Sequence, residues 1–166
     1  TINVNDVNEF AVSVISDSNG AANEIAEDAA NGDTVGLTAL ASDADGTNNT
    51  ITYSLDDDAS GRFAIDSSTG IVTLADNSLL DFETSASHSV TVRATSSDGS
   101  IQTRAFTISV IDSNDAPVIT SHGGGSIAFI NVAEGALSVT TVVAQDTDLP
   151  ADVLTFSIVG GADAGW

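Results

Sequence analysis

The sequence contains no cysteine, no methionine and no lysine, and its positive charge comes from three arginines. Without cysteine the chain can form neither disulfide bonds nor thiolate metal sites. Without a basic patch it cannot neutralise phosphate groups, which argues against nucleic acid as a partner and against binding to anionic membranes. Since no run of about 18 apolar residues is present, the sequence predicts no membrane insertion by this segment.

The chain also lacks an initiator methionine and a signal peptide. We therefore expect it to be a piece of a longer protein whose targeting and anchoring information lies outside this segment.

What the sequence has in excess is acid, with 24 Asp and Glu residues, 3 basic residues and a net charge of -21 at pH 7. An excess this large strains a compact fold by self-repulsion unless cations or high salt offset it. Each acidic residue alone fits a solvated surface group in a protein from a salty habitat. The acids are unevenly placed, however, and their clustering favours cation binding.

Helical periodicity is nearly absent, and short runs rich in Val, Ile, Thr and Phe alternate with clusters of Gly, Asn, Asp and Ser. This pattern predicts an all-β fold, a seven-stranded Greek-key β-sandwich of the immunoglobulin-like kind. In residues 89–94 and 106–110 apolar and polar side chains alternate, as a sheet buried on one face requires. The expected strands cover residues 11–15, 35–42, 51–55, 63–65, 71–74, 88–94 and 101–111.

Several motifs occur twice at the spacing of one domain, which indicates an internal repeat. Asn5-Asp6 recurs as Asn114-Asp115, and Asp43-Ala44-Asp45 recurs as Asp146-Thr147-Asp148. We therefore expect tandem repeats arranged end to end, with the second one truncated. The predicted divisions are the tail and linker of a preceding repeat in 1–9, a complete domain in 10–115, and the N-terminal part of a following domain in 116–166.

The segment Asp112-Ser113-Asn114-Asp115-Ala116-Pro117 would join the two repeats. In an extended chain the side chains of Asp112 and Asn114 point one way, and those of Ser113 and Asp115 point the other. Pro117 restricts its own backbone and that of the residue before it to extended geometry. The linker can thus present oxygen ligands on two sides, and calcium takes six to eight oxygens.

Together these motifs resemble the cadherin repeats of bacterial surface adhesins. The resemblance is carried by Ala26-Glu27, Asp43-Ala44-Asp45 with residues 51–55, residues 63–72, Leu80-Asp81-Phe82-Glu83 and the linker. It implies calcium as the cofactor, commonly three ions at each junction between repeats. The implied downstream ligands are Glu27, Asp81 and Glu83 from the base of the complete domain, Asp112, Ser113, Asn114 and Asp115 from the linker, and Asp146 and Asp148 from the next repeat.

Seven of these ligands are carboxylates, and three calcium ions would bring six positive charges to balance them. Without metal, two carboxylates about 4 Å apart repel each other by roughly 4 kcal/mol at an effective dielectric constant near 20. We therefore expect calcium to convert a hinged joint between repeats into a rigid one.

At the upstream junction the resemblance implies ligands from the linker and from the complete domain, namely Asn3, Asn5, Asp6, Asp43, Asp45 and the carbonyl of Asn48. Two features depart from the family pattern. Asn3 stands where the downstream linker has Asp112, which removes one charge. The family also commonly places an Asp after the Val-x-Ala that ends near Ala94, whereas here Thr95-Ser96 follow and Asp98 comes two residues later. We expect this site to be less complete than the downstream one.

The resemblance implies an extracellular segment of a cell-surface or secreted adhesin, tethered to a membrane by parts outside it. The expected partners are calcium ions, neighbouring repeats of the same chain, and another adhesin or a cell-surface glycan, with homophilic adhesion as the family's mode. Two other functions stay open: a metal-indifferent acidic spacer, and a carbohydrate-binding accessory module of a secreted enzyme. The carbohydrate-binding module is disfavoured because it would need a platform of exposed aromatic side chains, and aromatic residues make up 5% of the chain.

Nothing in the sequence predicts catalysis, so we expect a protein that is not an enzyme. His88 and His122 have no nucleophile or metal partner near them in the sequence. The run 56–61 resembles the first half of an EF-hand loop, but Ser67 stands where the bidentate Glu belongs. We interpret that run as a polar loop.

Overall fold

The computed structural model describes residues 8–148 and 153–160, and its internal contacts divide the chain into two compact units, residues 1–113 and 114–166. This division falls inside the predicted linker, while the domain boundaries expected at 9/10 and 115/116 stay predictions. Within the described residues, no helix has both the length and the apolar character needed to cross a membrane.

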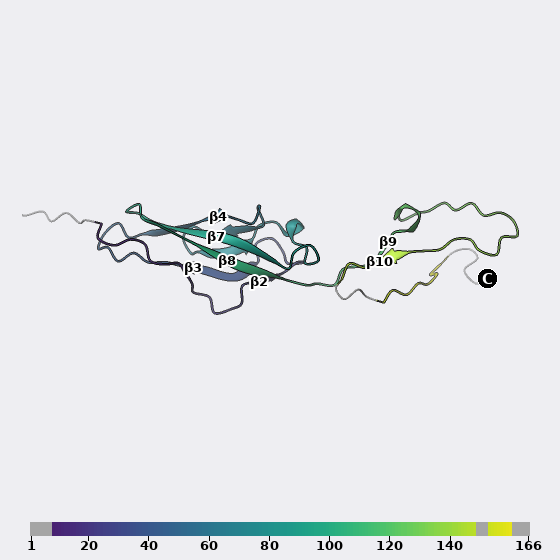
Figure 1. Ribbon diagram of the computed structural model, residues 1–166, viewed down its shortest axis with the longest axis horizontal. Helices are drawn as coiled ribbons and strands as arrows, with labels where there is room; N and C mark the ends of the chain where they lie inside the picture. Colours follow the sequence, from purple (N-terminus) through teal and green to yellow (C-terminus); the bar gives the residue numbers. More distant parts are fainter. Residues whose placement is uncertain (1–7, 149–152, 161–166) are drawn as a thin grey trace, which may run out of the picture. The chain divides into compact units, whose positions relative to one another are not determined.

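The first unit is a β-sandwich built from two four-stranded sheets (Figure 1). One sheet has the strand order β1-β3-β6-β5 and is antiparallel. The other has the order β2-β8-β7-β4, in which β2 runs parallel to β8 and the remaining pairs are antiparallel. The predicted all-β sandwich is therefore confirmed.

The elements of this first unit are β1 Ser16–Asp17, β2 Glu24–Ala26, β3 Thr34–Leu40, β4 Ile51–Asp57, β5 Phe63–Ile65, β6 Ile71–Leu74, the 3₁₀ turn η1 Asn77–Leu79, β7 Ser87–Ser96 and β8 Ile101–Ile111.

Three details at the N-terminal side of this unit differ from the expected strands. The strand β1 at Ser16–Asp17 was not predicted. Residues 11–15 form no strand, because their backbone groups bond to separate partners instead of a single ladder: Val12 N–H donates to Ser100 Oγ and Ser13 N–H to the Ser42 carbonyl. The strand β2, with three residues and one buried side chain, was not predicted. It is too short to show the alternation on which the other predictions rest.

The antiparallel pair of β7 and β8 forms the longest ladder of the sandwich, from Ser87↔Ser109 to Thr95↔Ile101. Every second side chain is buried from Val90 to Ser96 on β7 and from Phe106 to Val110 on β8. The apolar ones among them meet apolar residues of the facing sheet, such as Leu37 and Leu74, in one core cluster. The apolar and polar alternation of the sequence thus corresponds to the inward and outward faces of this sheet.

Two glycines allow backbone segments of the sandwich to approach closely. Gly36 has a φ of +78°, and a Cβ there would lie 2.0 Å from the carbonyl oxygen of Ala22. Gly70 has a φ of +71°, and its Cβ would lie 2.3 Å from the carbonyl oxygen of Ala39. Both the backbone conformation and the space therefore demand glycine.

The second unit is described in residues 114–148 and 153–160, where β9 Val118–Ile119 pairs antiparallel with β10 Ala144–Gln145 and the 3₁₀ turn η2 covers Ser121–Gly123. Large apolar side chains are open to solvent, with Phe129 96% exposed and Val159 98% exposed. Asp148 is the one buried residue among those described in this unit. These described residues therefore form no apolar core of their own.

Two of the three isoleucines of β8, Ile101 and Ile108, predict very different stability effects. Ile108 is fully buried and Ile101 is 51% exposed. We expect Ile108→Ala to lower the free energy of unfolding of the first unit by about 2–5 kcal/mol, because it removes buried methyl groups and leaves a cavity. The matched variant Ile101→Ala should cost about 0.5 kcal/mol or less. Urea unfolding followed by circular dichroism measures both, and equal losses would contradict the assignment of the core face.

Candidate metal centres

Three carboxylates converge at the end of the first unit where β8 leaves it. Glu27, Glu83 and Asp112, here named the basal cluster, each offer one oxygen, and these oxygens all lie within 4.8 Å of one another. Glu27 follows β2, Glu83 precedes β7 and Asp112 follows β8. The parallel pairing of β2 with β8 places Ala26 opposite Ile111, so the residues that follow, Glu27 and Asp112, emerge side by side.

The carboxylate of Glu27 connects the base of the domain to the start of the linker. Its Oε2 accepts a hydrogen bond from Phe82 N–H at 2.7 Å, and its Oε1 accepts one from Ser113 N–H at 2.8 Å. Because each carboxylate oxygen has two acceptor positions, both oxygens can still face a cation.

Asp81, also predicted as a ligand, lies beside the basal cluster with its carboxylate turned to Thr84. The Thr84 N–H donates to Oδ1 at 2.8 Å and the Thr84 hydroxyl donates to Oδ2 at 2.9 Å. These hydrogen bonds, led by the backbone one, lower the pKa of Asp81 below its ordinary value. Asp81 is therefore a carboxylate anion at neutral pH.

Within the second unit, the end of the linker is tied to the repeated Asp-x-Asp motif. Asp115 N–H donates to both carboxylate oxygens of Asp148, at 3.0 and 3.2 Å, and the Thr147 hydroxyl donates to Asp115 Oδ2 at 3.2 Å. Asp146 Oδ1 accepts from Asp148 N–H, and the Asn114 side-chain amide donates to the Asp115 carbonyl. Three predicted carboxylates are thus gathered at the start of this unit.

A second cluster in the first unit contains Asp43, Asp45 and Asp98, here named the apical cluster. Their ligand oxygens also lie within 4.8 Å of one another. Asp45 is 3% exposed, and its Oδ1 accepts hydrogen bonds from the backbone N–H groups of Glu9 and Phe10 at 3.0 and 3.1 Å. The Oδ2 atoms of Asp43 and Asp45 are buried and receive no hydrogen bond from the described part of the chain.

Asp98 is the site residue that the sequence prediction did not assign. The position where the family pattern expects an acid holds Ser96, which is buried and donates its hydroxyl to the Asn48 carbonyl at 3.0 Å. The available signal was the pair Asp98-Gly99, a turn dipeptide between two strands. The predicted upstream ligands Asn3, Asn5 and Asp6 lie outside the described residues.

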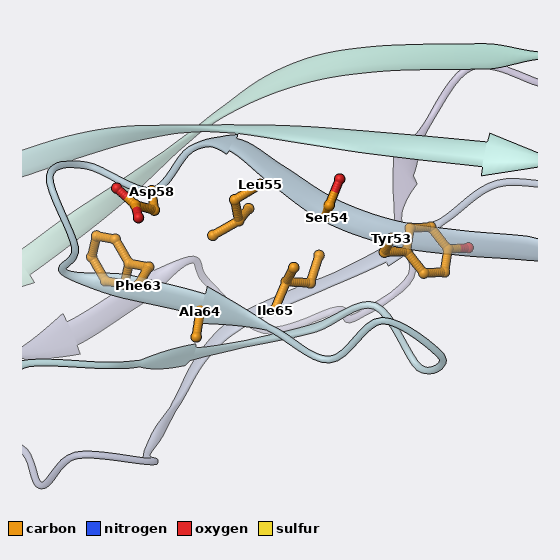
Figure 2. A pocket seen from close by; sticks show the side chains of 7 residues that line it. All are labelled: Tyr53, Ser54, Leu55, Asp58, Phe63, Ala64 and Ile65. Carbon is orange, nitrogen blue, oxygen red and sulfur yellow. The ribbon is translucent and has the colours of Figure 1, made fainter.

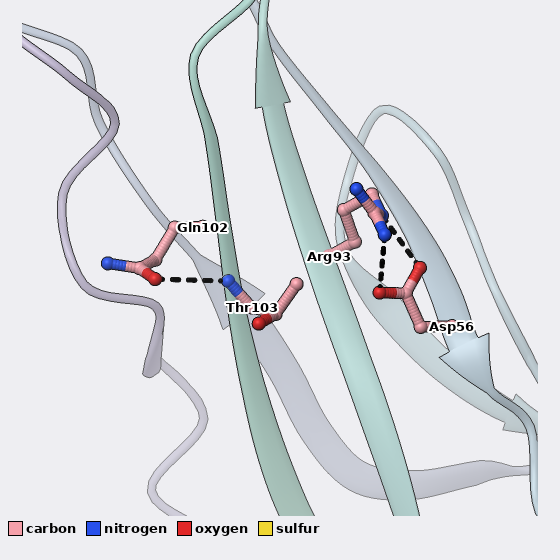
Figure 3. A network of polar contacts seen from close by, with 4 residues as sticks. All are labelled: Asp56, Arg93, Gln102 and Thr103. Atoms are coloured by element: carbon pink, nitrogen blue, oxygen red, sulfur yellow. Dashed lines mark hydrogen bonds and ion pairs between the residues drawn. The ribbon is translucent and has the colours of Figure 1, made fainter.

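The three arginines make their hydrogen bonds away from these clusters. Arg93 forms a two-pronged ion pair with Asp56, at 2.6 and 2.7 Å, which raises the pKa of Arg93 (Figure 3). Arg62 and Arg104 donate to backbone carbonyls, at Leu79 and at Ile15 respectively. Asp56 is therefore held by an arginine and lies in β4, so the predicted polar loop over 56–61 is wrong for Asp56 and Asp57, which belong to the strand.

The chain belongs to the cadherin domain family. The model of that family, described as Cadherin domain, matches residues 22–111, which is more than half of the chain. The mouse protein Protocadherin Fat 4 is 41% identical over 112 residues, which cover 63% of this chain and 2% of that protein. The predicted resemblance to cadherin repeats is thus confirmed.

Solved structures of cadherin domains share the fold. Mouse Cadherin-23 EC22-24 is 29% identical with a TM-score of 0.60, covering 86% of this chain and 45% of that one. The extracellular cadherin domains 1–4 of Protocadherin Gamma B7 are 27% identical with a TM-score of 0.58, covering 86% of this chain and 34% of theirs. The chain therefore spans less than half the length of each of these relatives.

The hydrogen bonds to Asp81 predict the effect of one substitution. Thr84→Val removes the hydroxyl donor and keeps the backbone N–H donor, so the pKa of Asp81 should rise toward its model-peptide value of 3.8 in calcium-free buffer. The folded state gains stability from this carboxylate above the unfolded pKa and loses it as the pH falls through the lowered one. Carboxyl ¹³C NMR titration measures the pKa. Thr69→Val, which acts in the same way on Asp66, serves as the control and should leave Asp81 unchanged.

Proposed function

We propose that this chain is a calcium-binding segment of a cell-surface or secreted adhesin, in which calcium at the junctions between cadherin repeats makes the array rigid for cell adhesion. The observation that carries the proposal is the basal cluster, because it converges three carboxylate oxygens within 4.8 Å at the point where the chain leaves the domain. Calcium is a hard cation that binds such oxygens in numbers of six to eight.

The donor set fits calcium in its chemistry. At the downstream junction we assign Glu27, Asp81 and Glu83 from the domain, residues 112–115 from the linker, and Asp146 and Asp148 from the following unit. All contribute oxygen, and none is a sulfur or nitrogen ligand that would favour zinc. Bound calcium supplies the positive charge that offsets repulsion among these carboxylates.

Two contacts support a role for the linker in this coupling. Ser113 N–H is held by the Glu27 carboxylate in the first unit. Asp115 N–H is held by the Asp148 carboxylate in the second unit. These two carboxylates, Glu27 and Asp148, thus also fix the linker backbone next to them, so an ion bound there would stiffen the chain on that side.

The proposed localisation, partners and upstream ligands are those that membership of the cadherin family implies. Protocadherin Gamma B7 is described as having extracellular cadherin domains, and we place this chain outside the cell as well, tethered to a membrane by parts beyond this segment. Its partners would be calcium ions, neighbouring repeats of the same chain, and another adhesin or a cell-surface glycan. At the upstream junction we assign Asn3, Asn5, Asp6, Asp43, Asp45 and the Asn48 carbonyl.

A carbohydrate-binding module is a weaker alternative. The sandwich has a pocket at its edge between β4 and β5, lined by Tyr53, Ser54, Leu55, Asp58, Phe63, Ala64 and Ile65 (Figure 2). Its two aromatic side chains are buried in the core, with Tyr53 7% exposed and Phe63 2% exposed. This pocket therefore presents no exposed ring on which a sugar could stack.

Calorimetric titration separates the calcium proposal from the acidic-spacer alternative. We expect calcium to bind the chain with a Kd of about 10⁻⁴ to 10⁻³ M, the range of extracellular modules, and magnesium to bind more weakly. Glu27→Gln should weaken calcium binding at least about tenfold, because it removes a charged ligand. The control Glu24→Gln removes the same charge from an exposed position of β2. Equal affinities for the two variants, or no heat with the natural chain, would favour the spacer.

Small-angle scattering tests whether calcium makes the joint rigid. The distribution of overall dimensions should narrow when calcium is added and widen again with a chelator, because metal replaces repulsion by shared ligation. Asp115→Ala in calcium should resemble the chelated natural chain. Asp57→Ala, which also removes one carboxylate but lies at the end of β4, should behave like the natural chain. Identical scattering from the Asp115→Ala and Asp57→Ala variants would count against the proposal.

A further inference from the structure

Asparagine is followed by glycine at two places in the sequence, Asn19-Gly20 and Asn31-Gly32. All four residues are exposed to solvent. An asparagine before glycine is chemically labile, because glycine has no Cβ to keep the following backbone nitrogen away from the side-chain amide carbon. Sequence and exposure thus make the two pairs equivalent, and any difference between them comes from how the fold holds each one.

The Asn31-Gly32 pair is held by hydrogen bonds at both of its reacting groups. Gly32 N–H donates to the Leu74 carbonyl at 2.8 Å, and Asn31 Oδ1 accepts from Asn77 N–H at 2.7 Å. The carbonyl of the next residue, Asp33, accepts from Leu74 N–H at 2.8 Å. This turn is therefore tied to β6 and to the residues before η1, and the Gly32 nitrogen is free to react only while the turn is locally open.

The Asn19-Gly20 pair lies in the loop between β1 and β2, where the backbone nitrogen is available. Gly20 N–H donates to no acceptor in the described part of the chain. A Cβ placed on Gly20 would meet no atom within 4 Å, so the space around this residue is open. Asn19 Oδ1 accepts from Ala21 N–H at 3.0 Å, which closes a turn around Gly20 and keeps the side-chain amide of Asn19 beside it.

We propose that Asn19 is a site of spontaneous deamidation in the folded chain and that the fold protects Asn31. The Gly20 nitrogen loses its proton to solvent base and forms a bond to Asn19 Cγ. The Cγ–Nδ2 bond then breaks, and ammonia leaves with a proton taken from water. A further water molecule hydrolyses either carbonyl of the resulting succinimide, which gives aspartate or isoaspartate.

The turn also favours the attack electrostatically. Negative charge develops on Asn19 Oδ1 as the new bond forms, and Ala21 N–H already donates to this atom. A donor that is in place before the reaction stabilises such charge without reorganisation. The reaction needs no metal ion, so it is independent of the proposed calcium sites.

The modification changes a loop that passes from one sheet of the sandwich to the other. The strand β1 lies at the edge of one sheet and β2 at the edge of the other. Both products add a negative charge two residues from Asp17, whose Oδ1 accepts from Asn19 N–H at 2.9 Å and from Thr38 N–H at 3.1 Å. Isoaspartate also inserts a methylene group into the backbone. The amide NMR signal of Thr38 should therefore change as the reaction proceeds.

Peptide mapping of the full 166-residue chain after incubation at neutral pH measures both sites in one sample. Digestion after glutamate places Asn19 and Asn31 in different peptides, because Glu24 and Glu27 lie between them, and mass spectrometry detects the exchange of amide for carboxylate in each. In the folded chain Asn19 should react at least about tenfold faster than Asn31, because the Gly32 nitrogen is available only during local opening. In urea, where both turns are unfolded, the two rates should become similar.

Gly20→Ala tests the role of the Gly20 nitrogen, and the fold has space for the added methyl group. This variant should slow the reaction at Asn19 at least about tenfold, because the methyl group hinders the approach of the side-chain carbon to the nitrogen. Asn31 in the same sample is the internal control and should keep its rate. Amide hydrogen exchange of the natural chain is an independent measurement, in which Gly20 should exchange freely and Gly32 should be protected.

Several results would overturn the proposal. Equal rates at the two sites of the folded chain, a faster reaction at Asn31, or no conversion at Asn19 would each contradict the assignment. An unchanged rate at Asn19 in the Gly20→Ala variant would show that water hydrolyses the amide directly, without attack by the Gly20 nitrogen. Equal hydrogen exchange at Gly20 and Gly32 would remove the structural difference from which the inference starts.

Discussion

The antiparallel pairing of β7 with β8 is the constraint that places the candidate ligands of the first unit. Glu83 precedes β7 and Asp112 follows β8, so both lie at the open end of this hairpin, whereas Asp98 lies in its closing turn. The ten residues of β7 separate the two ends by about 30 Å. One long ladder therefore holds two acidic clusters at opposite ends of the same domain, which is the arrangement that a chain of end-to-end repeats requires.

The rigidity of the hairpin comes from the core beneath it. Val90, Val92 and Ile108 are fully buried and pack within the same cluster as Leu37 and Leu74 of the facing sheet. Carboxylates held close together on a flexible chain would move apart, because their repulsion at about 4 Å is worth roughly 4 kcal/mol at an intermediate dielectric. A packed sandwich resists that movement, so apolar packing in the middle of the domain preserves the acidic clusters at its ends.

Backbone N–H groups provide part of the compensation for the clustered charge. The Glu27 carboxylate accepts from Phe82 and Ser113, and the Asp45 carboxylate accepts from Glu9 and Phe10. In both clusters, these hydrogen bonds also tie an entering or leaving segment of the chain to the end of the sandwich. The arginines contribute elsewhere, as the ion pair of Arg93 with Asp56 illustrates. The charge that remains is what a divalent cation would neutralise.

Local patterns were enough to predict most strands and most of the clustered acids. The alternation in 89–94 and 106–110 identified the two strands of the hairpin, and the acidic motifs identified Glu27, Glu83 and Asp112, which the fold brings together. Local patterns failed where a segment is held by contacts from distant parts of the chain. Residues 11–15 have a strand-like composition, but their backbone N–H groups bond to two separate segments, at Ser100 and at Ser42. The short strand β2 forms because it can pair with β8.

By itself the sequence determined the all-β class, the excess of acid and the oxygen character of the ligands, because composition and short-range periodicity encode these properties directly. Only the tertiary structure decided which carboxylates meet. Asp98 joins Asp43 and Asp45, and Ser96 turns its hydroxyl to Asn48, because a hairpin turn and its hydrogen bonds to Thr50 set their positions. Those contacts join residues about fifty positions apart, a separation over which linear spacing carries no information on distance in the fold.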